Sequence, residues 1–214
     1  MTAVERVWLY TNFDCNLRCS YCLSSSHPQA PRREFGWAPY TQLVGQAAAL
    51  GIRELCITGG EPFLLSDMEQ RLAYAADRMR GTVLTNGLPL TTRRLAGMAH
   101  LRGLPLTLQI SLDGDRAELH DPYRGQGTWR RTVEAIQRVQ QAGFTVAVGA
   151  TETPVNGGAL GNLARFVESL GIPSDRFFVR PLTRRGVSDA GLDLTAADIA
   201  PELTVTADGV YWHP

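Results

Sequence analysis

The sequence predicts an α/β fold, a partial (β/α)6 barrel that ends in a short C-terminal β-hairpin. Six short runs of β-branched and apolar residues alternate with amphipathic stretches of helical period. Gly51, Gly143 and Gly171 each follow a helical stretch and precede a strand, where glycine commonly ends a helix. Repeated β-α units imply a parallel sheet with right-handed crossovers, and six of them favour an open, TIM-like barrel over a closed eight-fold one.

Each expected element follows from its own residues. The six strands are expected at Arg6–Thr11, Arg53–Thr58, Thr82–Thr85, Pro105–Leu112, Phe144–Ala150 and Arg176–Arg180. Three helical stripes lie between them: Met68, Leu72, Ala75, Ala76 and Met79; Trp129, Val133, Ile136 and Val139; and Leu160, Leu163, Ala164, Val167 and Leu170. Ser66-x-x-Glu69 predicts a capping box for the first of these helices. Alternation of apolar and polar residues around Asp208-Gly209 predicts a hairpin over Leu203–Trp212.

Length and composition predict one globular domain. The 214 residues can bury a sizeable core, and 44% hydrophobic with 20% charged residues excludes a disordered or collagen-like chain. We expect a core at residues 1–186, followed by a segment at 187–214 that carries the hairpin and belongs to the same domain. We expect the stretch Arg184–Pro201 to be mobile.

Charge excludes several classes of function. Lys+Arg and Asp+Glu both number 21, which argues against non-specific binding to nucleic acid or to a membrane surface. The sequence contains no lysine, so Schiff-base and P-loop lysine chemistry are excluded. No apolar run approaches the ~18 residues of a membrane span, and the N-terminus lacks the features of a signal peptide. We therefore expect a cytoplasmic protein with reduced thiols.

Three of the four cysteines form a cluster just after the first expected strand. Cys15, Cys19 and Cys22 lie at the C-terminal rim, where β-α folds keep their active sites. Three thiolates are one short of a closed site, since structural zinc and electron-transfer [4Fe–4S] clusters normally take four ligands. A zinc site completed by His27 or Cys56 is the alternative, although Cys56 lies mid-strand and reads as a small core residue.

The cysteine spacing and three further motifs resemble a known family. Cys15-x3-Cys19-x2-Cys22, with Tyr21 before the third cysteine, is similar to the signature of the radical S-adenosylmethionine (SAM) superfamily. The other motifs follow successive strands in family order: Thr58-Gly59-Gly60-Glu61-Pro62, Thr85-Asn86-Gly87, and Ser111-Leu112-Asp113-Gly114 with His120-Asp121 and Arg124-Gly125. Zinc would not explain these motifs.

The resemblance implies two cofactors and a set of residues that bind them. Cys15, Cys19 and Cys22 would hold one [4Fe–4S] cluster, whose open iron chelates SAM. Gly59 and Gly60 would let the backbone approach the methionine because neither has a Cβ, and Glu61 would accept from its ammonium. Arg124 would bind the SAM carboxylate, and Tyr21 with the strand-end backbone of Val148 and Arg180 would contact the adenine. The remaining expected SAM contacts are Ser111, Asp113 and Asn86. Asn86 could instead serve only to shape a turn.

Other conspicuous side chains have structural interpretations. His120 is expected to cap or pack a helix rather than to catalyse. Trp8, Trp37 and Trp129 are expected in packing positions rather than as substrate stackers.

Within the superfamily, residues 108–186 are most similar to the molybdenum-cofactor-biosynthesis and SPASM-type peptide-modifying branch. The expected function is reductive cleavage of SAM to a 5′-deoxyadenosyl radical, which abstracts hydrogen from a peptide or small metabolite. A single-electron donor such as flavodoxin or ferredoxin is implied. After Cys22 only Cys56 remains, so the auxiliary-cluster extension of that branch is not expected, and a partner protein could complete the lid. The alternatives are a catalytically degenerate partner subunit or a glycyl-radical-enzyme activase.

Overall fold

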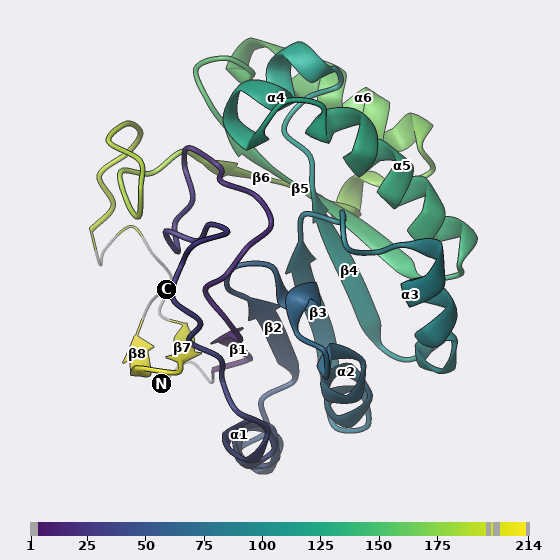
Figure 1. The fold of residues 1–214 in the computed structure, drawn as a ribbon, viewed down its shortest axis with the longest axis vertical. Helices are drawn as coiled ribbons and strands as arrows, with labels where there is room; N and C mark the ends of the chain where they lie inside the picture. Colours follow the sequence, from purple (N-terminus) through teal and green to yellow (C-terminus); the bar gives the residue numbers. More distant parts are fainter. Residues whose placement is uncertain (1–3, 196–197, 199–201, 213–214) are drawn as a thin grey trace.

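A curved, eight-stranded sheet organises the molecule (Figure 1). The computed structural model describes residues 4–195, 198 and 202–212. The strands are β1 (Arg6–Tyr10), β2 (Glu54–Thr58), β3 (Arg80–Thr85), β4 (Leu106–Ser111), β5 (Thr145–Glu152), β6 (Phe177–Pro181), β7 (Leu203–Thr206) and β8 (Gly209–Trp212). Their order in the sheet is β6-β5-β4-β3-β2-β1-β7-β8. Because β1 to β6 are all parallel neighbours, the six-fold open barrel expected from the sequence is confirmed.

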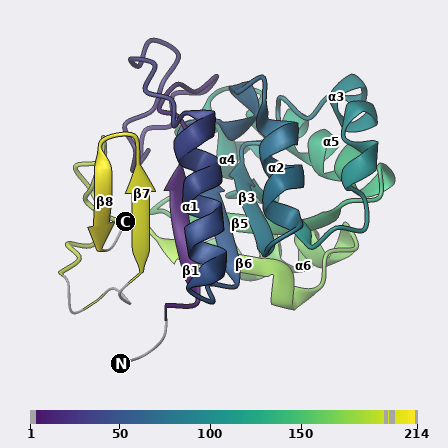
Figure 2. The ribbon, with the colours of Figure 1, turned by 90° about the horizontal axis from the view of Figure 1, so that it is seen from below.

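Helices cover the convex face of this sheet (Figures 1 and 2). They are α1 (Trp37–Ala49), α2 (Met68–Ala76), α3 (Thr92–Gly97), α5 (Thr128–Gln141) and α6 (Leu160–Ser169), while α4 (Ala117–Arg124) packs on α5 beyond the end of β4. Strand side chains alternate between the two faces, so Val7, Leu9, Leu55 and Ile57 meet the helices in the hydrophobic core. The alternate positions of the same strands face the concave side and leave it partly hollow.

The predicted hairpin is confirmed, and its place in the sheet is new. β7 and β8 pair antiparallel around the Asp208-Gly209 turn. β7 also pairs in parallel with β1, with Val7 opposite Leu203 and Leu9 opposite Val205. Periodicity can predict a hairpin but not the strand beside which it docks. The domain boundary after residue 186 stays a prediction.

Several predicted boundaries are wrong in detail. β3 begins two residues before the predicted Thr82, and β5 continues past Ala150 to Glu152. The capping box at Ser66 is also wrong, because the N-cap of α2 is Asp67 and no side chain caps it. Glu69 instead accepts from Arg94 Nε at 2.7 Å, so a tertiary ion pair takes the carboxylate that the local motif would use.

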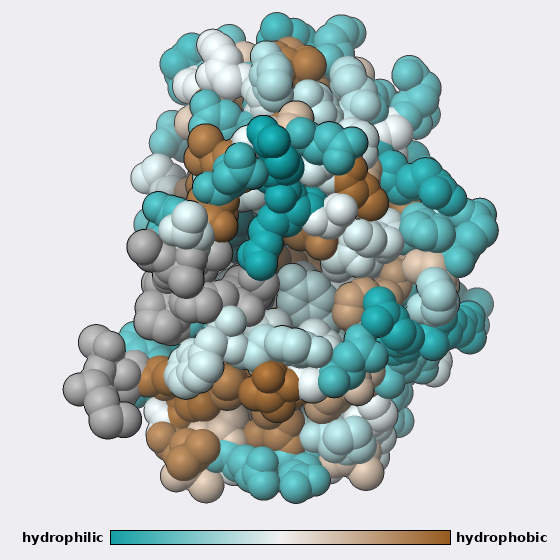
Figure 3. Space-filling view, turned by 90° about the vertical axis from the view of Figure 1, so that its left-hand side faces the viewer, coloured by the Kyte–Doolittle hydropathy of each residue, from teal (hydrophilic) through white to brown (hydrophobic). Residues whose placement is uncertain are grey.

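The edges and surface of the sheet have two further features. β6 and β8 form its outer strands, and β8 exposes Val210, Tyr211 and Trp212. Viewed from the side that carries β7 and β8, hydrophobic residues gather in the lower part of the molecule and hydrophilic ones above (Figure 3). In the part of the chain that is described, no helix is long and apolar enough to cross a bilayer.

Candidate functional site

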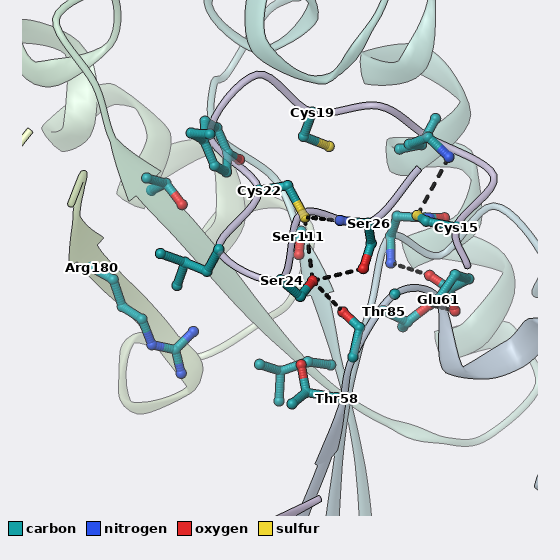
Figure 4. Close-up of a pocket in the computed structure, with 18 of the residues that line it drawn as sticks. Cys15, Cys19, Cys22, Ser24, Ser26, Thr58, Glu61, Thr85, Ser111 and Arg180 are labelled. Carbon is teal, nitrogen blue, oxygen red and sulfur yellow. Dashed lines mark hydrogen bonds between the residues drawn. The ribbon is translucent and has the colours of Figure 1, made fainter. Parts of the chain in front are cut away.

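A cavity of about 390 Å³ lies where the parallel strands end, beneath the loop that carries the cysteines (Figure 4). We call it the upper cavity. It is lined by every residue expected from the sequence to bind the cluster or SAM except Asp113 and Val148. Residues that follow four different strands therefore meet at one place, as the motif order predicts.

The backbone of the cysteine loop is anchored by Asn12, a residue that the sequence analysis missed. Its fully buried side chain donates to the carbonyls of Asp14 at 3.0 Å and Glu61 at 3.1 Å. Backbone amides return the contact, since Gly60 N donates to Asn12 O at 2.8 Å and Glu61 N to Asp14 O at 3.0 Å. A polar residue directly after a buried strand was the only signal in the sequence.

Gly59 and Gly60 are needed by the chain itself. A Cβ on Gly59 would lie 2.3 Å from Asn12 O, and one on Gly60 would lie 2.0 Å from Asp14 O. Gly59 also has φ +130°, which disfavours a side chain. The family resemblance implies this close approach for the methionine of SAM, whereas in the structure the cysteine loop lies against both glycines.

The three thiols of the loop are not in disulfides and are half-buried. Cys15 Sγ accepts from Leu17 N at 3.4 Å, and Cys22 Sγ accepts from Ser26 N at 3.3 Å. Burial raises the pKa of Cys15 to about 12 and also raises the pKa of Cys19. Thiols with such values are neutral at pH 7 unless bound iron or zinc displaces the proton.

The donor set fits a multi-iron cluster better than a single ion. Among the described residues, no three His, Cys, Asp or Glu side chains converge on one ion position. In a cubane [4Fe–4S] cluster the three thiolates need not point at one ion, because each of them binds a different iron. The zinc alternative also lacks a fourth ligand, since Cys56 lines another cavity and the His27 ring contacts Arg18 and Gln29.

Glu61 lies at the cavity wall with its side chain fully buried, and its carboxylate accepts hydrogen bonds from the chain itself. Oε1 accepts from Thr85 Oγ1 at 2.7 Å and Phe63 N at 3.1 Å, and Oε2 accepts from Asn86 N at 2.8 Å. Burial raises the pKa of Glu61 to about 7 against the lowering effect of these donors. In this structure the carboxylate joins the ends of β2 and β3, and its expected contact with a ligand ammonium stays a prediction.

Asp113 is the centre of a buried network beside the upper cavity. One carboxylate oxygen accepts from Tyr21 Oη and from Arg124 Nε, the latter at 2.6 Å. The other accepts from Thr151 N at 2.9 Å. His120 Nδ1 accepts from the backbone N of Asp113 at 3.1 Å, so His120 positions the network, which agrees with a structural role.

The other predicted site residues differ in their placement. Ser111 ends β4 and lines the cavity, and Asn86 donates to Asn16 Oδ1 at 2.8 Å while its own Oδ1 closes the turn with Leu88 N. The predicted strand end at Val148 is wrong, because β5 continues to Glu152 and Val148 is buried in the core. Thr151 is the residue of β5 that lines the cavity.

Two further side chains lie elsewhere than expected. Trp8 was expected to pack rather than to face a ligand, yet it lies on the concave side, lines the upper cavity and donates to Glu202. Arg180, expected to act through its backbone, directs its guanidinium toward the space below the cysteine loop (Figure 4).

Part of the segment expected to be mobile docks on the cysteine loop. Val187 N donates to Cys22 O at 3.2 Å, and a Cβ on Gly186 would lie 2.1 Å from the same oxygen. Arg184 N donates to Leu192 O at 2.9 Å, which closes the segment on itself. Residues 196–197 and 199–201 lie outside the described residues. The described part therefore packs against the cysteine loop.

Comparison with known proteins identifies the family. The model of the radical SAM superfamily matches residues 9–160, which contain all three cysteines and the motifs after β2, β3 and β4. The chain belongs to the radical SAM superfamily. Enzymes of this superfamily use a [4Fe–4S] cluster and SAM, so the resemblance drawn from the motifs is confirmed.

Curated relatives carry two kinds of name. Mycofactocin maturase MftC of Mycolicibacterium smegmatis is 35% identical over 136 residues, which are 63% of this chain and 34% of that protein. AdoMet-dependent heme synthase of Methanosarcina barkeri is 29% identical over 183 residues, 82% of this chain and 50% of that protein. The chain thus spans between a third and a half of the length of these relatives.

Solved structures confirm the radical SAM fold. SuiB of Streptococcus suis, in a crystal structure with bound S-adenosylmethionine, superposes with a TM-score of 0.72 at 19% identity. The match covers 84% of this chain and 41% of SuiB. At this identity the likeness concerns the fold alone.

Proposed function

We propose that this chain is the core of a radical SAM enzyme in which Cys15, Cys19 and Cys22 hold one [4Fe–4S] cluster and the upper cavity binds SAM. The cluster and SAM would supply a 5′-deoxyadenosyl radical by reductive cleavage, and this radical would abstract hydrogen from a substrate. One observation carries the proposal: three unpaired thiols of one loop line the same cavity as the ends of β2, β3, β4 and β5.

The chain's own residues would have distinct tasks in this site. Gly59, Gly60 and Asn12 hold the cysteine loop against β2. Arg124 Nε donates a hydrogen bond to Asp113, and the two Nη groups of Arg124 make no hydrogen bond with a described residue. They are therefore available to the carboxylate of SAM, as the sequence analysis expects. The Ser111 hydroxyl at the cavity wall suits the ribose.

The substrate class is a peptide or a small metabolite. The relatives support both, since MftC is named as a maturase and AdoMet-dependent heme synthase makes a small molecule, and SuiB has been crystallised with its precursor peptide SuiA. We further propose a single-electron donor such as flavodoxin or ferredoxin, a location in the cytoplasm, and a substrate or partner protein that completes the cover formed by residues 184–195.

The test is SAM cleavage by the anaerobically reconstituted chain. With dithionite as reductant, we expect 5′-deoxyadenosine and methionine in equal amounts, and we expect neither from the Cys19→Ala variant. Deuterium transfer from candidate substrates into 5′-deoxyadenosine then identifies the reaction partner. A chain that holds its cluster and binds SAM but releases no 5′-deoxyadenosine is a degenerate partner subunit, and the proposal is then wrong.

A further inference from the structure

A second cavity lies deeper on the concave face of the sheet. It has a volume of about 210 Å³, and we call it the lower cavity. Inward-facing side chains from all six strands β1 to β6 line it. Trp8, Leu84 and Arg180 also line the upper cavity, so the two spaces share one wall.

Positive charge in the lower cavity is not balanced by the chain. Arg6, Arg176 and Arg180 line it, against the single carboxylate of Glu54. Arg6 is compensated by Glu54 at 3.1 Å and by Glu202 at 3.5 Å. The side chains of Arg176 and Arg180 make no ion pair or hydrogen bond with any described residue. Both side chains remain accessible to solvent. Partial burial and the neighbouring charge of Arg6 lower the pKa of Arg180, against the opposing effect of Glu202.

Gln109 provides a second and independent observation. Only 5% of its surface is exposed, yet its side-chain amide makes no hydrogen bond with a described residue and lines the lower cavity. The amide reaches the open space of the cavity, so it is free to donate to or accept from a group bound there. Opposite it, a Cβ on Gly149 would lie 2.6 Å from Gln109 Nε2, so glycine at this position leaves room for the amide.

We propose that the lower cavity is a receptor for a carboxylate of the substrate, bound by the guanidinium of Arg180 and the amide of Gln109. A guanidinium matches a carboxylate in charge and in its two parallel hydrogen bonds, and the amide NH2 adds a neutral donor. Arg176 adds a further positive charge to the lining of the cavity. This deepens the proposed function, on which it rests, because it assigns an acidic substrate to the same site.

The register of the sheet sets the reach of such a substrate. Gln109 and Ser111 are successive inward-facing residues of β4, and they line the lower and the upper cavity respectively. Successive residues on one face of a strand are ~7 Å apart. A substrate held by its carboxylate at Gln109 would therefore place the group about 7 Å away, near Ser111, beside the cysteine loop. That distance corresponds to two residues of an extended peptide or to a small acid with a side arm of similar length.

The experiment compares acids with their amides. The full chain, reconstituted with its cluster and saturated with SAM, is titrated by calorimetry with two probe pairs: N-acetyl-alanyl-tyrosine and its C-terminal amide, and 3-phenylpropionate and 3-phenylpropionamide. We expect the acid of at least one pair to bind roughly ten- to a hundred-fold more tightly than its amide. Preference in the peptide pair indicates a peptide C-terminus, and preference only in the second pair indicates a small acid.

Variants assign the preference to these side chains. Arg180→Gln should abolish it, and Gln109→Leu should reduce binding of the acid about five-fold. Arg130→Gln is the control, because Arg130 lies exposed on α5 and should leave the preference intact. If Arg180→Gln does not fold, as judged by circular dichroism, Gln109→Leu decides. Equal or undetectable binding of acid and amide by the unsubstituted chain overturns the proposal, as does full preference in Arg180→Gln or Gln109→Leu. Failure of SAM cleavage would instead overturn the proposed function.

Discussion

Arg124 on α4 donates through Nε to the carboxylate of Asp113, at the end of β4, over 2.6 Å. The Asp113 side chain is fully buried and that of Arg124 is 10% exposed. The motifs predict separate SAM contacts for these two residues. In the structure they form an ion pair with each other. Tyr21 joins them from the cysteine loop, so this pair ties the loop, β4 and α4 into one wall of the upper cavity.

Asp113→Asn should destabilise the chain strongly. Removing one charge leaves Arg124 buried without its counter-ion, which costs about 3–5 kcal/mol of unfolding free energy in comparable pairs. Urea unfolding at pH 7 measures this loss of unfolding free energy. Glu134→Gln is the matched control, since Glu134 pairs with Arg130 at 3.8 Å on an exposed helix face and should cost less than about 0.5 kcal/mol. Equal losses in the two variants would contradict the role of the pair.

His120 should make stability depend on pH. Burial lowers the pKa of its imidazole to about 4, from about 6.5 in the unfolded chain. Between these values the unfolded chain binds the extra proton, so stability is complete above about pH 6.5 and is lost as the pH falls through 4. The contribution is about 3 kcal/mol. His120→Gln should flatten this part of the curve in urea unfolding from pH 4 to 7.5, whereas His100→Gln, at an exposed position, should not.

Gly60→Ala should disrupt the cysteine loop. The new Cβ would lie 2.0 Å from Asp14 O, so the loop must move away from β2. We expect most of the iron bound after reconstitution to be lost. Gly45→Ala on α1 is the control, because its Cβ meets nothing within 4 Å and alanine should stabilise the helix by up to about 1 kcal/mol. Normal iron content in Gly60→Ala would show that the close approach is not required.

Iron analysis should separate the cysteines. The unsubstituted chain should bind about four irons and four sulfides. Each of the variants Cys15→Ala, Cys19→Ala and Cys22→Ala should lose the bound iron and sulfide. Cys56→Ala should retain both, because Cys56 is buried in β2 away from the upper cavity. About eight irons per chain, or loss of iron in Cys56→Ala, would contradict the single cluster.

Hydrogen exchange should reveal the state of residues 184–195. We expect amides there to exchange faster than those of β1 to β5 and to slow when substrate binds. The contacts of this segment with the cysteine loop run through few hydrogen bonds, such as Val187 N to Cys22 O. Protection that is already complete in the free chain would indicate a pre-closed site and would favour a small metabolite over a peptide.

Much of the site was predictable because motifs follow strands. In a parallel sheet the residues after each strand share one edge, so the cysteines, Gly59, Asn86 and Ser111 meet without knowledge of their contacts. The partners of buried polar groups were not predictable in this way. Nothing in the spacing indicates that Glu61 binds Thr85 and Asn86, or that His120 accepts from Asp113.

The sequence by itself determined the class of fold, the hairpin and the cysteine cluster, because these depend on period, turn chemistry and spacing within short stretches. Only the tertiary structure decided where the hairpin docks and what Gly59 and Gly60 approach. It also decided that Gln109 and Arg180 share a cavity. These last two residues lie on strands separated by β5, and they line one cavity because the sheet curves, which is a property of the assembled strands and not of any one of them.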